Sequence, residues 1–459
     1  MIFFFFQNTR PLHYVILGNR NGDRMRTLPI IALLAISAMA VAAQSVSQTT
    51  PAAQSHDLQS VAESVAQYFR ADPSGVGQLF APEFLTQVPA ARLETVMRQL
   101  YTQLGRCTGV KLEKQVSSTS AQFTFTFEKG FTAPVNLVIN ADASHSITGF
   151  VVGPPVSSSE TLSAVIEKMK LLPGRVSFLA QRLDASGPVA LGEWQPTQRL
   201  AIGSAFKLYI LGTLAHQISG GQRHWNDVIS LDVHSLPSGI LQSWPLGTPL
   251  TVQSAASLMI SRSDNTAADE LLKTVGREQV EAMLQVMGHS QPAVDQPFLS
   301  TMEMFQLKWG IPPDQLQQYI TNDIAARRAF LQMLKPPVSH ETLLAAASGT
   351  TPKMIDQVEW FASATDLCHA LAWFHADDSA RDTARQILAI NPGIPVSSTR
   401  WAYIGFKGGS EPGVISLNFL LRSRMGQWYV IGAVWNDPKA AVSETVWVGL
   451  ISRAIELLP

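Results

Sequence analysis

The sequence predicts a mixed α/β protein of the α+β kind. A small α+β domain precedes a larger one, in which helices cover an antiparallel sheet and a helical lobe is inserted. Alternation of apolar and polar residues, which is typical of half-buried strands, occurs within 123–152 and again within 403–435. Between these regions, residues 250–390 are mostly helical in pattern and are broken by Pro-Pro and Pro-Gly pairs. A chain of 459 residues has room for two or three domains.

The composition is that of a globular protein with a sparsely charged surface. Hydrophobic residues make up 46% and charged residues 15%, which excludes a disordered chain. Lys and Arg number 34 against 35 Asp and Glu, and no block of like charge occurs. This balance argues against nucleic acid and anionic membranes as partners. The two cysteines, Cys107 and Cys368, fall in different predicted domains, so we expect buried thiols rather than a bridge.

The N-terminus has the pattern of an export signal. Met25 and Arg26 precede an apolar run over 28–41, which ends in small residues of the Ala-x-Ala kind. The run is shorter than the ~20 residues that a membrane span needs, although a membrane anchor is the alternative. We therefore expect residues 1–43 to be a leader with translation starting at Met25, and the mature protein to be periplasmic or secreted.

A small domain is predicted over residues 57–153, after a linker over 44–56 that is rich in Ser, Gln, Thr and Ala. Two segments with helical period come first, and a segment with period two follows, in which Phe123, Phe125 and Phe127 alternate with threonines. This order predicts a compact α+β unit. It resembles the cystatin and steroid-isomerase cone folds, without a confirming motif, and we expect a structural or docking role.

The larger domain is predicted over residues 160–459. Its first part has the patterns of a helix, two strands and a second helix that starts at Ser204 and ends at a glycine pair. Three strands and a closing helix return after the helical block. The expected elements are a helix over 160–171, strands over 176–183 and 189–194, strands over 403–407, 414–421 and 428–435, and a helix over 442–458.

The feature that points to chemistry is the segment Gly203-Ser204-Ala205-Phe206-Lys207. If this segment opens a helix, the i to i+3 spacing puts the Ser204 hydroxyl and the Lys207 amine on one face. A serine at a helix N-terminus also lies among free backbone N–H groups, which favour negative charge. A serine hydroxyl needs a neighbouring base to act as a nucleophile. The pair therefore indicates nucleophilic catalysis, although Ser-x-x-Lys alone is a weak pattern.

Two further motifs follow, Ser263-Asp264-Asn265 and Lys407-Gly408-Gly409. Ser-x-x-Lys, Ser-Asp-Asn and Lys-Thr-Gly, in that order, mark class A β-lactamases and penicillin-binding proteins. The chain has the first two motifs intact and a Lys-Gly-Gly variant of the third, so residues 160–459 resemble this superfamily of serine hydrolases. A cone-like domain before a lactamase-like one also resembles a protein type encoded in clavulanate-type biosynthetic clusters. Each motif alone would be an ordinary turn, helix cap or strand end.

The resemblance implies a role for each matching residue. Ser204 would be acylated, and Lys207 would be the general base if burial and a second cation such as Lys407 lower its pKa. Ser263 would relay a proton to the leaving nitrogen, and Lys407 would attract a substrate carboxylate. The implied substrate-binding residues are Asn265, which would hold an amide, Gly409, and Ser410, whose N–H would join that of Ser204 in an oxyanion hole.

Two departures from the family pattern bear on turnover. A class A β-lactamase deacylates with a glutamate roughly 30–40 residues past Ser-Asp-Asn, acting through a water. Glu303 is the only glutamate near enough, but its flanks do not match, and Met302, Met304 and Phe305 suggest a helix. A deacylating carboxylate and an ordinary exposed helical carboxylate therefore both stay open. Gly408 removes the hydroxyl donor that is usual at its position, and both departures argue against a fast penicillinase.

The sequence thus predicts an exported serine hydrolase of the class A β-lactamase type that hydrolyses β-lactam or related amide and ester bonds. An esterase, a D,D-peptidase-like enzyme and a penicillin-binding protein with little turnover are the alternatives. We expect small-molecule or peptide-like substrates and no cofactor. The ten histidines show no metal-ligand spacing, so we expect no metal. The alternative from a different functional class is a non-catalytic scaffold that acts through residues 57–153.

Overall fold

The computed structural model describes residues 51–459 except 143, 154, 158, 159, 335–338, 377 and 395–399. The predicted leader, residues 1–43, lies outside the described residues. Within the described residues, the chain divides between 160 and 161 into two compact units. A search of the same residues finds no helix with the length and apolar character that crossing a membrane requires.

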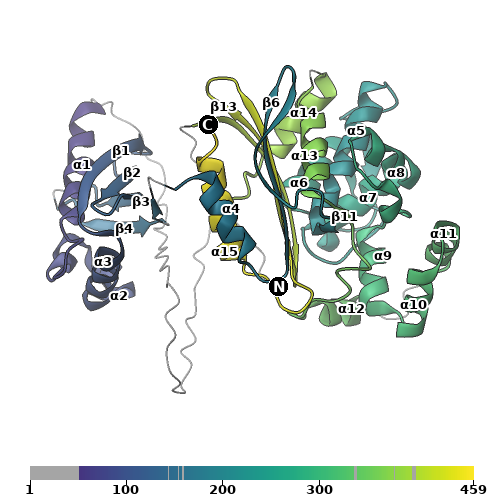
Figure 1. Cartoon of the computed structure of the whole chain (residues 1–459), viewed down its shortest axis with the longest axis horizontal. Helices are drawn as coiled ribbons and strands as arrows, with labels where there is room; N and C mark the ends of the chain where they lie inside the picture. Colours follow the sequence, from purple (N-terminus) through teal and green to yellow (C-terminus); the bar gives the residue numbers. More distant parts are fainter. Residues whose placement is uncertain are drawn as a thin grey trace. The chain divides into compact units, whose positions relative to one another are not determined.

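The smaller unit is built on an antiparallel sheet of strand order β1-β2-β3-β4, with the short β5 paired to β3. The three alternating phenylalanines lie on β2 and are buried, with Phe123 opposite Val135 in the register. The helices precede the sheet in the chain, and α1 packs against it (Figure 1). The elements are α1 (Pro51–Ala66), η1 (Val76–Leu79), α2 (Pro82–Gln87), α3 (Ala90–Leu104), β1 (Cys107–Gln115), β2 (Ser120–Phe127), β3 (Phe131–Ile139), β4 (Ile147–Val152) and β5 (Val156–Ser157).

One boundary of this unit differs from the prediction. Helix α1 begins at Pro51, inside the stretch 44–56 that we expected to be a linker. The physical reason is local: proline suits the first position of a helix, and the alanines and glutamine that follow are good helix formers. The likeness to cystatin-type cones stays a prediction.

The larger unit contains a five-stranded antiparallel sheet of order β12-β13-β14-β6-β7, with β12 at one edge. Its central strands β13 and β14 are buried along nearly their whole length, because helices cover both faces. The strands are β6 (Arg175–Asp184), β7 (Gly187–Trp194), β12 (Trp401–Glu411), β13 (Val414–Ser423) and β14 (Trp428–Asn436). The mixed α/β class with an antiparallel sheet under helices is as the sequence predicts.

Two layers of helices enclose this sheet (Figure 1). On one face, α4 (Leu162–Lys170) and α15 (Glu444–Glu456) pack together and close a core around Trp447. On the other face, α13 (Ala364–Trp373) and α5 (Lys207–Ser219) belong to the largest apolar core, which continues into the helical lobe. The remaining helices are α6 (Val252–Ser261), α7 (Asn265–Val275), α8 (Arg277–Val286), α9 (Thr301–Phe305), α10 (Pro313–Thr321), α11 (Ile324–Met333), α12 (His340–Ala347) and α14 (Ser379–Leu388).

Short elements connect the lobe to the sheet. The turn η2 (Gly203–Phe206) is a 3₁₀ turn that runs directly into α5, so Ser204 lies one turn before the α-helix proper. A π-helical segment, η5 (Gln306–Gly310), follows α9. The others are β8 (Leu200–Ala201), β9 (Val228–Ser230), η3 (Leu241–Ser243), β10 (Pro249–Thr251), η4 (Pro292–Asp295) and β11 (Phe361–Ala362).

Candidate active site

Three segments far apart in the sequence meet at the start of α5. They are the turn η2, the loop between α6 and α7 that carries Ser263, and the edge strand β12 with Lys407. The structure thus brings together the residues that the three sequence motifs single out. The Ser263 hydroxyl is the common partner, because it accepts from Lys207 Nζ at 3.2 Å and from Lys407 Nζ at 3.0 Å.

The Lys207 amine contacts acceptors on three residues. Its Nζ donates to Ser204 Oγ at 3.1 Å, which is the contact that a general base needs with its nucleophile. It also donates to the Ser263 carbonyl at 2.7 Å and to Asn265 Oδ1 at 2.6 Å. The residue is 0% exposed because it opens a helix whose neighbours Leu208 to Ala215 are all buried. Packing therefore fixes the amine beside the hydroxyl.

Burial also changes the protonation of both lysines. Loss of solvent lowers the pKa of Lys207 to about 7, although the carboxylates of Asp264 and Asp269 act in the opposite direction. The pKa of Lys407 lies well below its ordinary value, because the amine is buried and faces the Lys207 cation. At neutral pH, a substantial fraction of Lys207 amines is therefore neutral and able to accept a proton.

The Ser263 backbone has a conformation that serine rarely adopts, with φ at +53°. Its carbonyl is held by Lys207 and by the Ser238 hydroxyl, which donates to it at 2.7 Å. Strained backbone of this kind persists only where its surroundings over-determine it, and it gathers at functional sites. Ser238 is a contact that sequence analysis missed, because no pattern connects residues 25 positions apart.

Asp264 and Asn265 hold the loop in place. Asp264 caps α7 by accepting from Ala267 N, and its second oxygen accepts from Ile240 N and Leu241 N. The Asn265 amide bridges Lys207 and the Leu236 carbonyl, to which Nδ2 donates at 3.1 Å. Two of the hydrogen-bonding positions of the Asn265 side chain are therefore filled within the protein.

Two glycines allow the turn and the edge strand to approach closely. Gly203 has φ at +49°, and a Cβ added there would lie 3.1 Å from the Ser410 nitrogen. A Cβ at Gly409 would collide with the Ser204 nitrogen and lie 2.8 Å from that of Ala205. Only glycine fits at these positions without a shift of the backbone. The backbone nitrogens of Ser204 and Ser410 consequently lie on two chain segments in direct contact.

The glycine at 408 has a packing reason of its own. A Cβ at this position would meet the Phe406 ring at 2.6 Å and the Ser416 carbonyl oxygen at 3.0 Å. The space that a hydroxyl residue would need is thus occupied by an aromatic side chain of the same strand.

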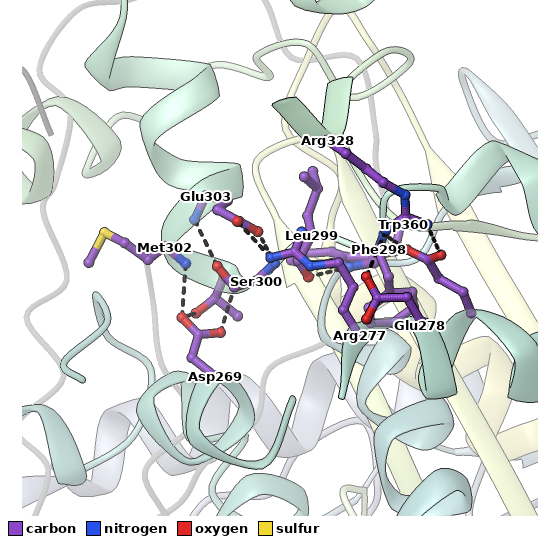
Figure 2. Close-up of polar contacts among 12 residues, drawn as sticks. Asp269, Arg277, Glu278, Phe298, Leu299, Ser300, Met302, Glu303, Arg328 and Trp360 are labelled. Atoms are coloured by element: carbon purple, nitrogen blue, oxygen red, sulfur yellow. Dashed lines mark hydrogen bonds and ion pairs between the residues drawn. The ribbon is translucent and has the colours of Figure 1, made fainter. Parts of the chain in front are cut away.

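Glu303 lies on α9, in the helix that its neighbours suggested, and both of its oxygens are used there. One accepts from Ser300 N at 2.8 Å in a capping box, and the other pairs with Arg277 at 2.7 Å (Figure 2). Its side chain is 17% exposed, so it is neither a free carboxylate nor an ordinary exposed one. Among the described residues, no hydrogen bond joins Glu303 to Ser204, Lys207 or Ser263.

A second buried carboxylate that acts on Lys207, besides Asp264, is Asp269, which sequence analysis missed. It accepts from Thr301 N at 2.7 Å, Thr301 Oγ1 at 2.8 Å and Met302 N at 3.0 Å (Figure 2). Burial raises the pKa of Asp269 to about 6. Its position four residues after Asn265 on α7 is the one signal that could have found it, since such residues share a helix face.

No group of three or more histidine, cysteine, aspartate or glutamate side chains is placed to hold a metal ion in the part of the chain that the structure describes. The cysteines at 107 and 368 are free thiols, the second of them buried.

Comparison with known families adds one match. Residues 158–347 match the model of the Beta-lactamase enzyme family. The matched region contains Ser204, Lys207, Ser263 and Asn265 and ends before Lys407. It supports a β-lactamase-like serine hydrolase family for this part of the chain.

Solved structures with similarity to the chain include three that cover 64% of it. A β-lactamase from Sphaerobacter thermophilus DSM 20745 is 17% identical with a TM-score of 0.45, and 94% of its chain is covered. A β-lactamase from Chitinophaga pinensis DSM 2588 is also 17% identical with a TM-score of 0.45, with 96% covered. The structure of PBP-A is 15% identical with a TM-score of 0.43, with 93% covered.

Proposed function

We propose that the protein is an exported serine hydrolase that is acylated on Ser204 by β-lactam or related amide and ester carbonyls. The observation that carries this proposal is the contact of 3.1 Å between Lys207 Nζ and Ser204 Oγ, made by an amine whose pKa is lowered to about 7. A neutral amine at hydrogen-bond distance is what converts a serine hydroxyl into a nucleophile. Export rests on the signal-like pattern around Met25.

In the proposed reaction, Ser204 Oγ attacks the carbonyl carbon while its proton passes to Lys207 Nζ. The developing oxyanion would accept from the backbone N–H groups of Ser204 and Ser410. Ser263 connects the two lysine amines, so it can pass the proton from Lys207 to the leaving nitrogen. Loss of one oxyanion donor typically lowers the rate by ~10²–10³. The close approach of β12 to the Ser204 turn therefore matters, because it brings the two N–H donors together.

Lys407 and Asn265 would act on the substrate. Lys407, on the edge strand β12, would attract a substrate carboxylate in its protonated form, with Gly409 allowing the strand to approach the Ser204 turn. Asn265 would contact a substrate amide through the side-chain hydrogen-bonding positions that Lys207 and the Leu236 carbonyl do not use. An esterase or D,D-peptidase-like activity would use the same groups. The leaving group that the pocket accepts therefore decides which of these activities the protein has.

The test is a panel of chromogenic β-lactams and short-chain esters, run on the wild type and on Ser204→Ala. We expect turnover of at least one class, and a fall of ~10⁴ or more in the variant, because the nucleophile is removed. Ser348→Ala, at an exposed serine that ends α12, is the matched control and should leave the rate unchanged. Equal turnover by wild type and Ser204→Ala would refute the proposed mechanism.

A second candidate is a penicillin-binding protein that acylates with little turnover. The observation that favours it is the engagement of Glu303 with Ser300 and Arg277, together with the engagement of Asp269 with Thr301 and Met302. Neither carboxylate is free to activate a water for deacylation. Intact-protein mass after mixing with a β-lactam separates the two candidates, because a persistent adduct favours the binding protein and a transient one the hydrolase.

A further inference from the structure

A buried ionic cluster lies next to the proposed oxyanion groups. Lys308, on η5, has a side chain that is 0% exposed. It donates to Glu359 Oε1 and, at 2.7 Å, to Glu411 Oε1. The three residues come from a helix, a loop and the edge strand, and they are 51 and 103 positions apart in sequence. A buried charge removed from water needs such partners.

The cluster has one cation for two carboxyl groups. Glu359 is 0% exposed at its side chain and Glu411 is 14% exposed. Glu359 Oε2 is buried without a hydrogen-bond partner in the described part of the chain, and Glu359 and Glu411 share the single Lys308 ammonium. Two carboxylates on one buried cation leave an excess negative charge, which a proton on one of them removes. Lys308 keeps its charge, because the two carboxylates outweigh the effect of burial and raise its pKa.

The carboxyl group whose pKa is raised is that of Glu411. Burial and the neighbouring Glu359 raise the pKa of Glu411 to about 8, against the effect of Lys308. Lys308, Glu359 and Glu411 are the charged groups that act on one another here. Below that pH the cluster is neutral overall, with one ammonium, one carboxylate and one carboxylic acid. Above it, the cluster carries a net negative charge.

Both carboxyl groups are attached to the segments that supply the proposed oxyanion donors. Glu411 directly follows Ser410 on β12. Glu359 directly precedes Trp360, whose carbonyl accepts from Ile202 N at 3.0 Å just before the Ser204 turn. The Trp360 ring also stacks on Phe206 of that turn, with ring centroids 3.7 Å apart. Lys308 thus links β12, which carries the Ser410 N–H, to the loop that supports the turn with the Ser204 N–H.

We propose that Glu411 and Glu359, held on Lys308 and sharing one proton, position the backbone N–H groups of Ser204 and Ser410 and set the alkaline limit of acylation. This inference rests on the proposed function of Ser204. The three are positioning residues, because they act through the backbone of their neighbours. Ionisation of Glu411 would push two carboxylates apart and place a negative charge close to the carbonyl oxygen as its own negative charge develops.

The experiment measures the rate of acylation from pH 6 to pH 9.5 by intact-protein mass, with a β-lactam or ester that labels the wild type. We expect the wild-type rate to fall about tenfold above pH 8, the order that one added charge gives a nearby charged transition state in a partly buried site. In Glu411→Gln this fall should disappear while acylation at pH 7 persists, because the amide keeps the hydrogen bonds and cannot ionise. Glu359→Gln should also lose the fall, since the remaining carboxylate pairs with Lys308.

The matched control is Glu444→Gln, which changes a carboxyl group whose pKa is also raised by burial but which lies on α15, outside the cluster. It should keep the wild-type profile. A Glu411→Gln profile identical to that of the wild type would overturn the inference and leave the proposed function standing, with Lys407 as the source of the alkaline limb. No acylation of the wild type at any pH would overturn the proposed function and this inference with it.

A second measurement does not depend on activity. The infrared C=O band of a protonated carboxylic acid should disappear with a midpoint near pH 8 in the wild type and be missing from Glu411→Gln at neutral pH. The same band in both proteins would show that no proton resides on Glu411 and would contradict the shared proton.

Discussion

Lys207 is a completely buried lysine, and its chemistry follows from that burial. Burial among apolar neighbours disfavours the charged amine, while two carboxylates on and before α7 partly restore it. The balance leaves the pKa near neutrality, where a base is most effective. A lysine buried without nearby carboxylates would be neutral, but nothing would stabilise its protonated form. A lysine in a salt bridge would stay protonated.

Asp264 is a single residue with a structural role, and the removal of its carboxylate should destabilise the protein. Asp264→Ala would leave three backbone N–H groups without their acceptor, at a cost of about 2–4 kcal/mol in the free energy of unfolding. Urea denaturation measures this. The control is Asp378→Ala, a partly exposed cap of α14 that should cost about 1 kcal/mol. Equal losses in both variants would contradict the role of the buried position.

The resemblance that the motifs carry was sufficient to predict that Ser204, Lys207 and Ser263 share a site. The cluster of Lys308, Glu359 and Glu411 could not be predicted in this way. Single charged residues in helical or loop patterns look solvated, and only the folded chain brings these three together.

At the scale of elements, the segment 298–303 is held by backbone hydrogen bonds to side chains at nearly every residue. Phe298 N donates to Glu281, the Leu299 carbonyl accepts from Trp360 Nε1, and Thr301 N donates to Asp269 (Figure 2). Glu281 is in turn paired with Arg328 of α11. The segment is thereby fixed between α7, α8 and the loop before β11.

Asp269→Ala should therefore loosen this segment. Thr301 N and Met302 N lose their acceptor, so their amides should exchange with deuterium at least about tenfold faster, a change of about 1.4 kcal/mol or more in local opening. Hydrogen exchange with peptide-level mass analysis measures this. Asp269→Asn keeps an acceptor oxygen and should show a smaller change. Unchanged exchange in Asp269→Ala would mean that the segment is held by its apolar contacts instead.

The periodicity of apolar residues predicted most strands and helices of both units, because each of these elements buries one face. It missed β1, whose residues are intermediate or exposed rather than alternately buried, and it placed a linker where α1 begins. The 3₁₀ turn at Ser204 was also outside its reach, since the close contact with Gly409 that shapes the turn comes from residues about 200 positions away.

At the scale of the whole molecule, each of the two units has its own apolar core. The core of the smaller unit runs from Leu58 to Phe150, and the cores of the larger unit use residues from 165 onward. Units with separate cores are able to fold independently. The site is built entirely from the larger unit.

We therefore expect residues 161–459 alone to unfold cooperatively and to be acylated at the rate of the full chain, within about twofold. Thermal unfolding followed by circular dichroism and the acylation rate check this. Residues 51–160 alone should also fold, and serve as the control for the cut between 160 and 161. A larger unit that is folded but acylated much more slowly would show that the smaller unit contributes to the site.

The central claim is that Lys207 activates Ser204. The most direct test is the pH dependence of covalent labelling by a β-lactam or ester, with the modified residue located by peptide mass. A group whose pKa is lowered to about 7 becomes a base as the pH rises through that value. We predict a single adduct on Ser204 whose rate of formation rises with a midpoint near pH 7, before the fall that is expected above pH 8. An adduct on another residue, or a rate on Ser204 that still rises toward pH 10 like that of an ordinary lysine, would contradict the account.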